Sequence, residues 1–223
     1  MEELPRFETP VDPRPDEEIW PGIQWPVPPK TVLHGRFVFL YPTTVHDIEE
    51  QFEDLDVDEC WQHAVFRPTQ VEQILWPLKS REYESPWQPW TVRLAKEYED
   101  KFSLSFVGTT SYMETSIRDA RTEIGATAYV PKVWGSKVNP ETKYLLLKYA
   151  FEELGMGRVQ LKTDIRNVRS QQAIARLGAT YEGILRRYQR RADGSIRDTV
   201  LFSITAEDWP KVRARLEERL YAE

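Results

Sequence analysis

Cysteine, histidine and long apolar runs are all scarce in this chain. The single cysteine, Cys60, excludes an internal disulfide. The three histidines lack metal-like spacing, so we expect them in packing or surface roles and expect no metal site: His34, His46 and His63. No apolar run approaches the roughly 18 residues that would span a bilayer, and residues 1–5 lack the basic start of a signal peptide. We therefore expect a soluble cytoplasmic protein with no membrane partner.

Basic residues are outnumbered by acidic ones. The formal net charge is -6, which argues against a general nucleic-acid binder. The charge is unevenly spread, because residues 156–197 are strongly basic and the remainder is acidic. We expect most of these basic side chains on solvated helix and hairpin faces. A few could instead contact a polyanionic small molecule.

Proline is concentrated at the start of the chain, where residues 1–30 hold half of the total of 16. Proline fixes φ and removes a hydrogen-bond donor, so an extended arm is expected there. Trp20, Ile23 and Trp25 should hold its second half against the body, although a proline-rich ligand for a partner is an alternative. Residues 31–223 show no linker and no repeat, and they are expected to form one domain.

Strand and helix patterns alternate through that domain. Strands are expected at 32–41, 90–96, 103–113, 121–130, 158–164, 179–189 and 196–205. Helices are expected at 44–55, 69–75, 140–154 and 168–177, and after Asp208. The rest of 56–89 is expected to be loop. The pattern predicts an α/β (α+β) fold, a mixed central sheet of about seven strands with helices on both faces.

A strand gives way to a helix between Val130 and Pro140. Asn139 is a good N-cap before Pro140, and the helix N-terminus with its free N–H groups can bind an anion. The stretch has only one glycine, Gly135, so by itself it is also consistent with a plain helix start. Lys137 could reach a phosphate or remain a solvated loop lysine.

Four segments carry a family resemblance. They are Glu123-Ile-Gly125, Trp134-Gly-Ser-Lys-Val-Asn-Pro-Glu-Thr-Lys143, Gly157–Ser170 and Asp193–Ser203. Together they resemble the acyl-CoA-binding motif of the GCN5-related N-acetyltransferases (GNAT), with the RimJ/RimL-type branch the most similar. The resemblance is specific over 121–209 and looser over 34–120.

The resemblance implies a slot for acetyl-CoA between two splayed central strands. The pantetheine arm would pair with backbone groups near Tyr129 and Val130, while Asn167 and Ser170 would lie along it. Asn167 could equally serve as a plain N-cap. Backbone N–H groups would hold the pyrophosphate along a short loop: Trp134, Gly135, Ser136, Lys137, Val138 and Asn139.

The resemblance also implies direct acyl transfer to an amine. Glu123 is then the candidate general base, directly or through water, or a structural carboxylate that orients the acceptor. It is expected on the same strand face as Thr127 and Tyr129. A backbone N–H near Val130 would stabilise the thioester oxyanion. Ile174 stands where many members have a tyrosine acid, so the departing thiolate would be protonated by water, Tyr181 or Tyr188.

The acceptor is expected to be a primary amine: a protein N-terminus, a peptide or a small amine. Its site should be built by residues 42–90, the loop before Thr115 and the hairpin 187–196. The tryptophans there could contact an apolar or aromatic acceptor, but we favour the alternative that they pack in the ordinary hydrophobic core. Two alternatives remain open: an acyl-CoA-binding module with little turnover, and an enzyme that uses succinyl-CoA or a longer acyl-CoA. A homodimer is a family expectation only.

Overall fold

The computed structural model describes residues 8–12, 14, 19–20, 22–75, 78, 86–96 and 105–222 of the chain. Residues 103–104 of the expected strand 103–113, and Pro5, Pro13, Pro15 and Pro21 of the arm, therefore lie outside the described residues. In the described part of the arm, the Trp20 indole donates to Gly155 O at 3.0 Å and Gln24 N donates to Leu154 O at 2.8 Å. The second half of the arm thus lies against the end of the central helix.

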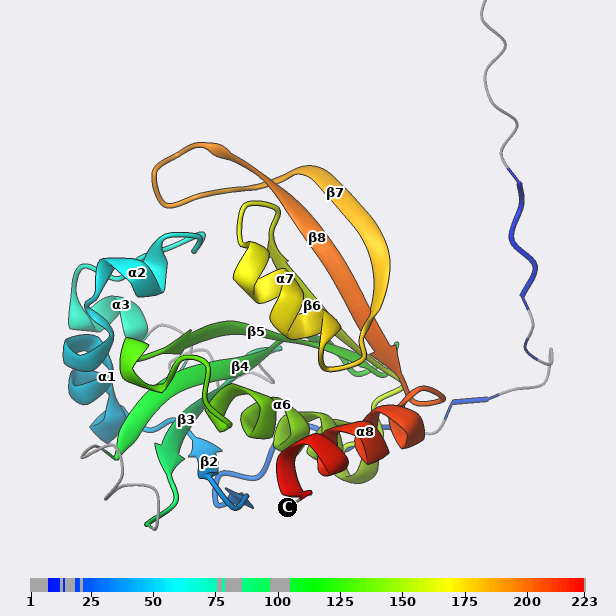
Figure 1. Cartoon of the computed structure of the whole chain (residues 1–223), viewed down its shortest axis with the longest axis horizontal. Helices are drawn as coiled ribbons and strands as arrows, with labels where there is room; N and C mark the ends of the chain where they lie inside the picture. The colour runs from blue at the N-terminus through cyan, green and yellow to red at the C-terminus, as the bar shows by residue number, and fades with distance from the viewer. Residues whose placement is uncertain are drawn as a thin grey trace, which may run out of the picture.

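A mixed sheet forms the centre of the molecule (Figure 1). Its strand order is β1-β2-β3-β4-β5-β6-β8-β7, and every neighbouring pair is antiparallel except β5 and β6. The strands are β1 (Leu33–His34), β2 (Val38–Pro42), β3 (Gln88–Leu94), β4 (Phe106–Ser116), β5 (Arg121–Tyr129), β6 (Arg158–Asp164), β7 (Thr180–Arg190) and β8 (Ile196–Thr205).

Helices cover both faces of this sheet, as predicted. They are α1 (Ile48–Leu55), α2 (Asp58–Trp61), α3 (Val71–Ile74), α6 (Val138–Lys148), α7 (Val168–Ala175) and α8 (Trp209–Tyr221), with a π-helical turn η4 (Tyr149–Glu153) after α6 and 3-10 turns η1 (Val45–Asp47) and η3 (Pro131–Val133). Among the described residues, none of these helices is long and apolar enough to cross a membrane.

Two hydrogen bonds identify the faces. Tyr112 OH on β4 donates to Leu146 O of α6 at 2.5 Å, whereas the Gln51 amide of α1 donates to Thr91 Oγ1 of β3 at 2.9 Å. The neighbour of Thr91, Trp90, packs edge-on against Tyr112, so α6 and α1 lie on opposite faces. Right-handed crossovers from β5 to β6 and on to β7 place α7 on the α6 face.

The expected strand 32–41 is wrong as a single strand. The backbone turns at 35–37, and β1 and β2 form a short hairpin. The cause is Glu141 on α6, which is fully buried and accepts the N–H groups of Arg36, Phe37 and Val38 at 2.9, 2.6 and 2.8 Å. A Cβ on Gly35 would lie 2.4 Å from Glu141 Cδ, so only glycine fits there.

Two other boundaries also differ from expectation. The stretch 56–89 contains α2, a single turn whose partly buried Cys60 and Trp61 pack on the core. The central helix begins at Val138 with Lys137 as its N-cap residue, so Asn139 lies inside the first turn instead of capping it. The Asp-Gly hairpin and the Asn167 N-cap are both as predicted: Gly194 has φ +82°, and Asn167 Oδ1 accepts Ser170 N at 3.0 Å.

Candidate active site

The two central strands part soon after they meet. β5 and β6 pair only over Arg121–Glu123 and Arg158–Gln160. Beyond this, β5 stays with β4 and β6 stays with β8. Ala126 and Thr127 are consequently exposed although they belong to a central strand. This is the splayed slot that the sequence predicts.

A β-bulge in β5 shapes the slot. Ser111 pairs with Gly125 and Thr109 with Ala128, so β5 has one extra residue here, and Ala126 takes a φ of +46°. An extra residue reverses the alternation of side chains after it. The expectation that Glu123, Thr127 and Tyr129 share a face is therefore wrong. Thr127 accepts a hydrogen bond from Lys143 of α6, whereas Glu123 points to the other face.

The backbone at the end of β5 indicates which N–H group near Val130 faces the slot. Val130 N donates to Val107 O at 3.0 Å, so this N–H is used within the sheet. Backbone groups alternate in direction along a strand, which turns the amide of Tyr129 toward the slot. The Tyr129 carbonyl accepts the Trp134 indole N–H at 2.9 Å and the Cys60 thiol at 3.4 Å. The donor nearest the slot is thus expected at Tyr129.

The loop after η3 has an open inner side. Gly135 has φ +76°, and a Cβ placed on it would meet nothing within 4 Å. Ser136 Oγ holds the loop by donating to Val133 O at 2.6 Å and accepting Val138 N at 3.2 Å. Lys137 Nζ donates to Arg219 O of α8 and so lies against a carbonyl in this structure. The loop presents the start of α6 to the slot.

The first turn of α7 faces this loop. Arg169 stacks its guanidinium 3.7 Å from the Trp134 ring centroid, a cation–π contact that joins α7 to the loop. Asn167, whose Oδ1 caps α7, and Ser170 lie on the same turn. The predicted residues Trp134–Asn139, Asn167 and Ser170 are therefore brought to one end of the slot.

Sequence reasoning missed a basic cavity beside the loop. It is an open depression of about 280 Å³ lined by Arg176, Arg215, Glu218 and Arg219. Arg219 donates to Arg176 O at 3.3 Å, so the ends of α7 and α8 meet here. The available signal was the spacing of Arg215 and Arg219, which puts both on one face of the last helix. Three guanidinium groups next to a helix N-terminus form a donor set suited to phosphate.

On the opposite face, Glu123 belongs to a charged cluster. Lys162 Nζ of β6 lies 2.8 Å from Glu123 Oε2 and 2.9 Å from Glu114 Oε1, and it also donates to Tyr188 OH at 3.2 Å. The side chains of Glu123 and Lys162 are only 8% and 5% exposed. Burial raises the pKa of Glu123, and the charge of Lys162 opposes this rise. Gly125 leaves room for the carboxylate, because a Cβ there would lie 2.6 Å from Glu123 Oε1.

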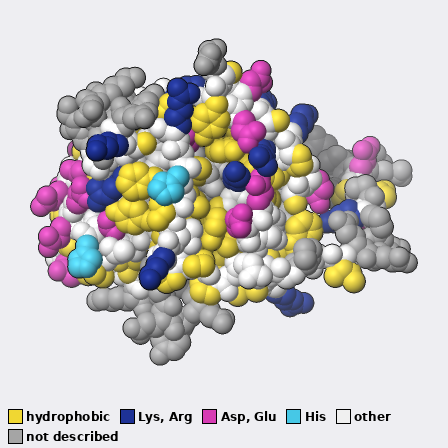
Figure 2. Space-filling view, turned by 90° about the horizontal axis from the view of Figure 1, so that it is seen from below, with side chains coloured by type: hydrophobic (Ala, Val, Ile, Leu, Met, Phe, Trp, Pro, Cys, Tyr) yellow, Lys and Arg dark blue, Asp and Glu magenta, His cyan; other side chains and the backbone are white. Residues whose placement is uncertain are grey.

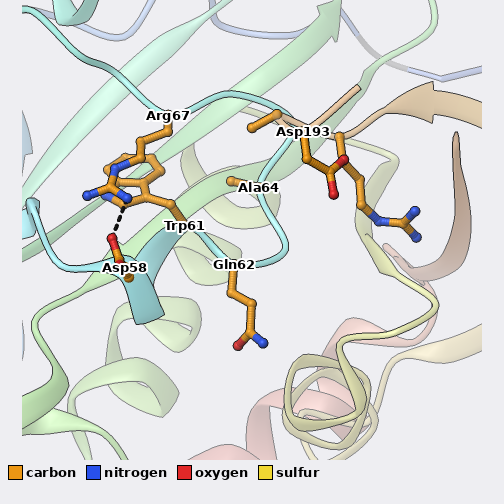
Figure 3. Close-up of a pocket in the computed structure, with 8 residues that line it drawn as sticks. Asp58, Trp61, Gln62, Ala64, Arg67 and Asp193 are labelled. Carbon is orange, nitrogen blue, oxygen red and sulfur yellow. Dashed lines mark hydrogen bonds and ion pairs between the residues drawn. The ribbon is translucent and has the colours of Figure 1, made fainter. Parts of the chain in front are cut away.

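A second cavity of about 200 Å³ lies on this side, between α2 and the β7–β8 hairpin (Figure 3). Its lining comes from Asp58, Trp61, Gln62, Ala64, Arg67, Arg191, Ala192 and Asp193. Ala192 N donates to Ala64 O at 3.3 Å, which joins the two walls. Figure 3 shows Arg67 turned toward Asp58, which it contacts at 2.5 Å, and Gln62 turned away from both. The Cys60 contact to Tyr129 puts this cavity next to the slot.

Similarity to known proteins agrees with this architecture. Residues 38–180 match the acetyltransferase (GNAT) domain family. The FsC-acetyl coenzyme A-N(2)-transacetylase of Aspergillus fumigatus is 34% identical over 188 residues, covering 81% of this chain and 79% of the relative. A solved structure of an assigned acetyltransferase from T. thermophilus is 36% identical, with a TM-score of 0.75 over 89% of this chain and 100% of the other. Mycobacterium smegmatis RimJ, solved with CoA-disulfide, is 21% identical with a TM-score of 0.71 over 86% and 95%, a likeness of fold.

The chain therefore belongs to the GNAT acetyltransferase family, and it is an acyl-CoA-dependent N-acetyltransferase. The slot fits the co-substrate of that family. Along one side it has, one after another, the open turn at Gly135, the N-terminus of α6 and the arginine-lined cavity. Within the described residues, no group of three or more metal-ligating side chains occurs.

Proposed function

We propose that this enzyme acetylates the primary amine of a small molecule by direct transfer from acetyl-CoA. The observation that carries the proposal is the partly open cavity between α2 and the β7–β8 hairpin, which lies beside the slot and whose two walls are joined by the Ala64–Ala192 contact. Such a cavity fits a compact acceptor better than a folded protein surface. The transacetylase relative, whose name gives FsC as the acceptor, makes FsC one candidate acceptor for this enzyme.

The surface charge suits a cationic acceptor. Figure 2 shows acidic side chains gathered at the end of the molecule that α1 occupies. This helix has the sequence Ile-Glu-Glu-Gln-Phe-Glu-Asp-Leu and includes no basic residue. A negative field near the acceptor side raises the local concentration of an ammonium substrate.

The acetyl-CoA site is proposed along the slot. Acetyl-CoA supplies a thioester whose acyl group is open to attack by an amine. Its pyrophosphate would be held at the start of α6 by backbone N–H groups between Trp134 and Asn139. The N–H groups of Trp134, Ser136 and Val138 already donate within the loop, so those of Gly135, Lys137 and Asn139 are the ones proposed to contact it. Its pantetheine arm would lie between Tyr129–Val130 and the Asn167–Ser170 turn. The cavity beside Lys137 would take the phosphorylated nucleotide end.

Proton removal is proposed on the acceptor face. The raised pKa of Glu123 makes its carboxylate a better proton acceptor, and Lys162 keeps it ionised. Glu123 is buried, so a water is proposed to pass the proton from the acceptor. The Tyr129 amide, instead of that of Val130, would stabilise the developing negative charge on oxygen.

An acceptor screen tests the proposal. Purified protein is mixed with acetyl-CoA and panels of diamines, amino acids, peptides and ribosomal-protein N-termini, and thiol release is followed. We expect turnover with a small amine and little with peptides. Turnover confined to protein N-termini would instead support the RimJ/RimL-type branch, which the Gly-Ser-Lys-Val-Asn loop favours. Tight CoA binding without turnover of any amine would support a binding module, and faster reaction with succinyl-CoA would change the acyl donor.

A further inference from the structure

A buried lysine lies behind the slot, on a helix face that is otherwise core. Lys143 of α6 is 5% exposed, and it precedes the buried run Leu145–Leu147 by two residues. Its Nζ donates to Thr127 Oγ1 at 2.7 Å and to Thr110 Oγ1 at 3.2 Å. The two hydroxyl oxygens are 2.7 Å apart. This network sits at the β5 bulge, next to Ala126.

Thr127 connects this buried network to the slot. It is exposed, because β5 has already parted from β6 at this position. Its oxygen accepts from the Lys143 ammonium, and either Thr127 or Thr110 can donate across their 2.7 Å contact. When Thr110 is the donor, the Thr127 hydrogen is available to another neighbour. The backbone acceptor at Gly125 O is long, at 3.4 Å. The hydroxyl can therefore donate forward into the slot while it accepts from behind.

The tyrosines considered from sequence are placed elsewhere. Ile174 is 7% exposed and packs in the core. Tyr181 lies on β7, separated from β6 by β8, and contacts Phe202. Tyr188 bonds Lys162 on the acceptor face. Thr127, in contrast, is exposed on the part of β5 that has separated from β6 and borders the slot.

We propose, on the basis of the proposed function, that Thr127 protonates the departing CoA sulfur and that Lys143 restores the proton to Thr127. As the thioester C–S bond breaks, its electron pair stays on sulfur, and an S–H bond forms with the Thr127 hydroxyl proton. The Thr127 oxygen takes a proton from the Lys143 ammonium, which becomes a neutral amine. Solvent reprotonates Lys143 after the product leaves, and the acceptor's proton departs separately through Glu123.

The electrostatics of Lys143 agree with this role. Burial lowers the pKa of Lys143 to about 7, partly opposed by the Glu123 carboxylate on β5. The partners from β4 and β5 that contact its amine, Thr110 and Thr127, are neutral. A donor that titrates near neutral pH transfers protons efficiently in both directions.

The decisive measurement is the pKa of the thiol of bound CoA, followed by thiolate absorbance in the enzyme–CoA complex. A nearby donor stabilises the thiolate, so Thr127→Val and Lys143→Met should each raise this thiol pKa by at least about one unit, or tenfold in the ionisation constant. Thr127→Ser should keep the wild-type value. Lys148→Met, on the same helix but away from the slot, is the matched control.

Turnover gives the second readout. We expect Thr127→Val and Lys143→Met to lower kcat by about 10²-fold or more, with the KM for acetyl-CoA changed only a few-fold. In the wild type, kcat should fall above neutral pH as Lys143 loses its proton. This fall should be absent from both variants. If the pKa of the bound CoA thiol is the same in wild type, Thr127→Val and Thr127→Ser, the proposal for Thr127 is wrong. Turnover by the wild type would in that case still support the proposed function. Wild-type protein that neither binds CoA nor acetylates any amine would overturn the proposed function itself. If Lys143→Met does not fold, the two Thr127 variants decide the question.

Discussion

Removing the carboxylate of Glu141 should destabilise the whole fold. This side chain receives four donors: three backbone N–H groups of the β1–β2 turn, and Tyr221 OH at 2.7 Å. It therefore fastens an edge hairpin and the end of α8 to the start of the central helix. No local pattern around Glu141 supplies a substitute acceptor, because its partners are far away in sequence.

The magnitude follows from what is left behind. Glu141→Ala strands the N–H groups of Phe37 and Val38, whose bonds are buried, while Arg36 N is partly exposed and can find water. An unsatisfied buried donor costs about 1–3 kcal/mol, so a loss of about 4 kcal/mol is expected, a large fraction of a typical stability of 5–15 kcal/mol. Glu141→Gln keeps one acceptor oxygen and should lose about 2 kcal/mol.

Urea unfolding followed by far-ultraviolet circular dichroism measures these losses. Glu153→Gln, an exposed substitution on the turn that follows the same helix, should change stability by less than about 0.5 kcal/mol. Gly35→Ala should also destabilise, since its new Cβ would meet the Glu141 carboxyl group. A Glu141→Ala protein within about 1 kcal/mol of wild type would refute the reasoning, because the hairpin would then be held by something else.

Three further predictions concern charge. Burial favours the neutral form of Asp164, but hydrogen bonds from Arg191 lower the pKa of Asp164 overall. The stability that this buried pair contributes is therefore present above about pH 4 and is lost as pH falls through the folded-state pKa. Asp164→Asn should cost about 3–5 kcal/mol of unfolding free energy at neutral pH and should flatten the decline in stability at acid pH, as measured by urea unfolding. The folded-state pKa of Lys143, about 7, lies below its unfolded-state value near 10.4, so between these two pH values the unfolded chain binds more protons than the folded one. Relative to Lys143→Met, the free energy of unfolding of the wild type should therefore rise from pH 7 toward pH 10 by at most about 1.4 kcal/mol per pH unit. Parallel curves of stability against pH for the two proteins would contradict this. Arg219→Ala removes one wall of the cavity beside Arg176 and should weaken acetyl-CoA binding about tenfold in calorimetry. The affinity for 3′-dephospho-acetyl-CoA should not change. An equal loss of affinity for both compounds would place the 3′-phosphate elsewhere.

Features encoded by neighbouring residues could be predicted from the sequence. The Asp-Gly hairpin, the Asn167 cap and the strand that ends at Tyr129 all depend on contacts within a few residues. The splay of β5 from β6 was also expected, through resemblance, because the motif residues that surround it lie in one continuous stretch. The cofactor residues remain predictions, and the structure brings them to one end of the slot.

Features that depend on distant partners could not be predicted in this way. The β1–β2 turn is set by Glu141, about a hundred residues away, and the sequence around Gly35 alone reads as one strand. The basic cavity needs α7 and α8 to meet, which joins Arg176 to Arg219. Lys143 has no local signal that separates it from a solvated helix lysine, because a buried amine is recognisable only after Thr110 and Thr127 are placed beside it.

In the proposed mechanism, the bulge at Ala126 places the two proton-transfer groups on opposite faces of β5. Ala126 is not glycine, yet it adopts φ +46°, so no composition rule marks it. Strict alternation would put Glu123 and Thr127 on the same face and give both to one substrate. The extra residue instead leaves Glu123 on the acceptor face with Lys162, and turns Thr127 toward α6 and Lys143. In the proposed mechanism, proton removal from the amine and proton delivery to the sulfur therefore proceed on opposite sides of a single strand.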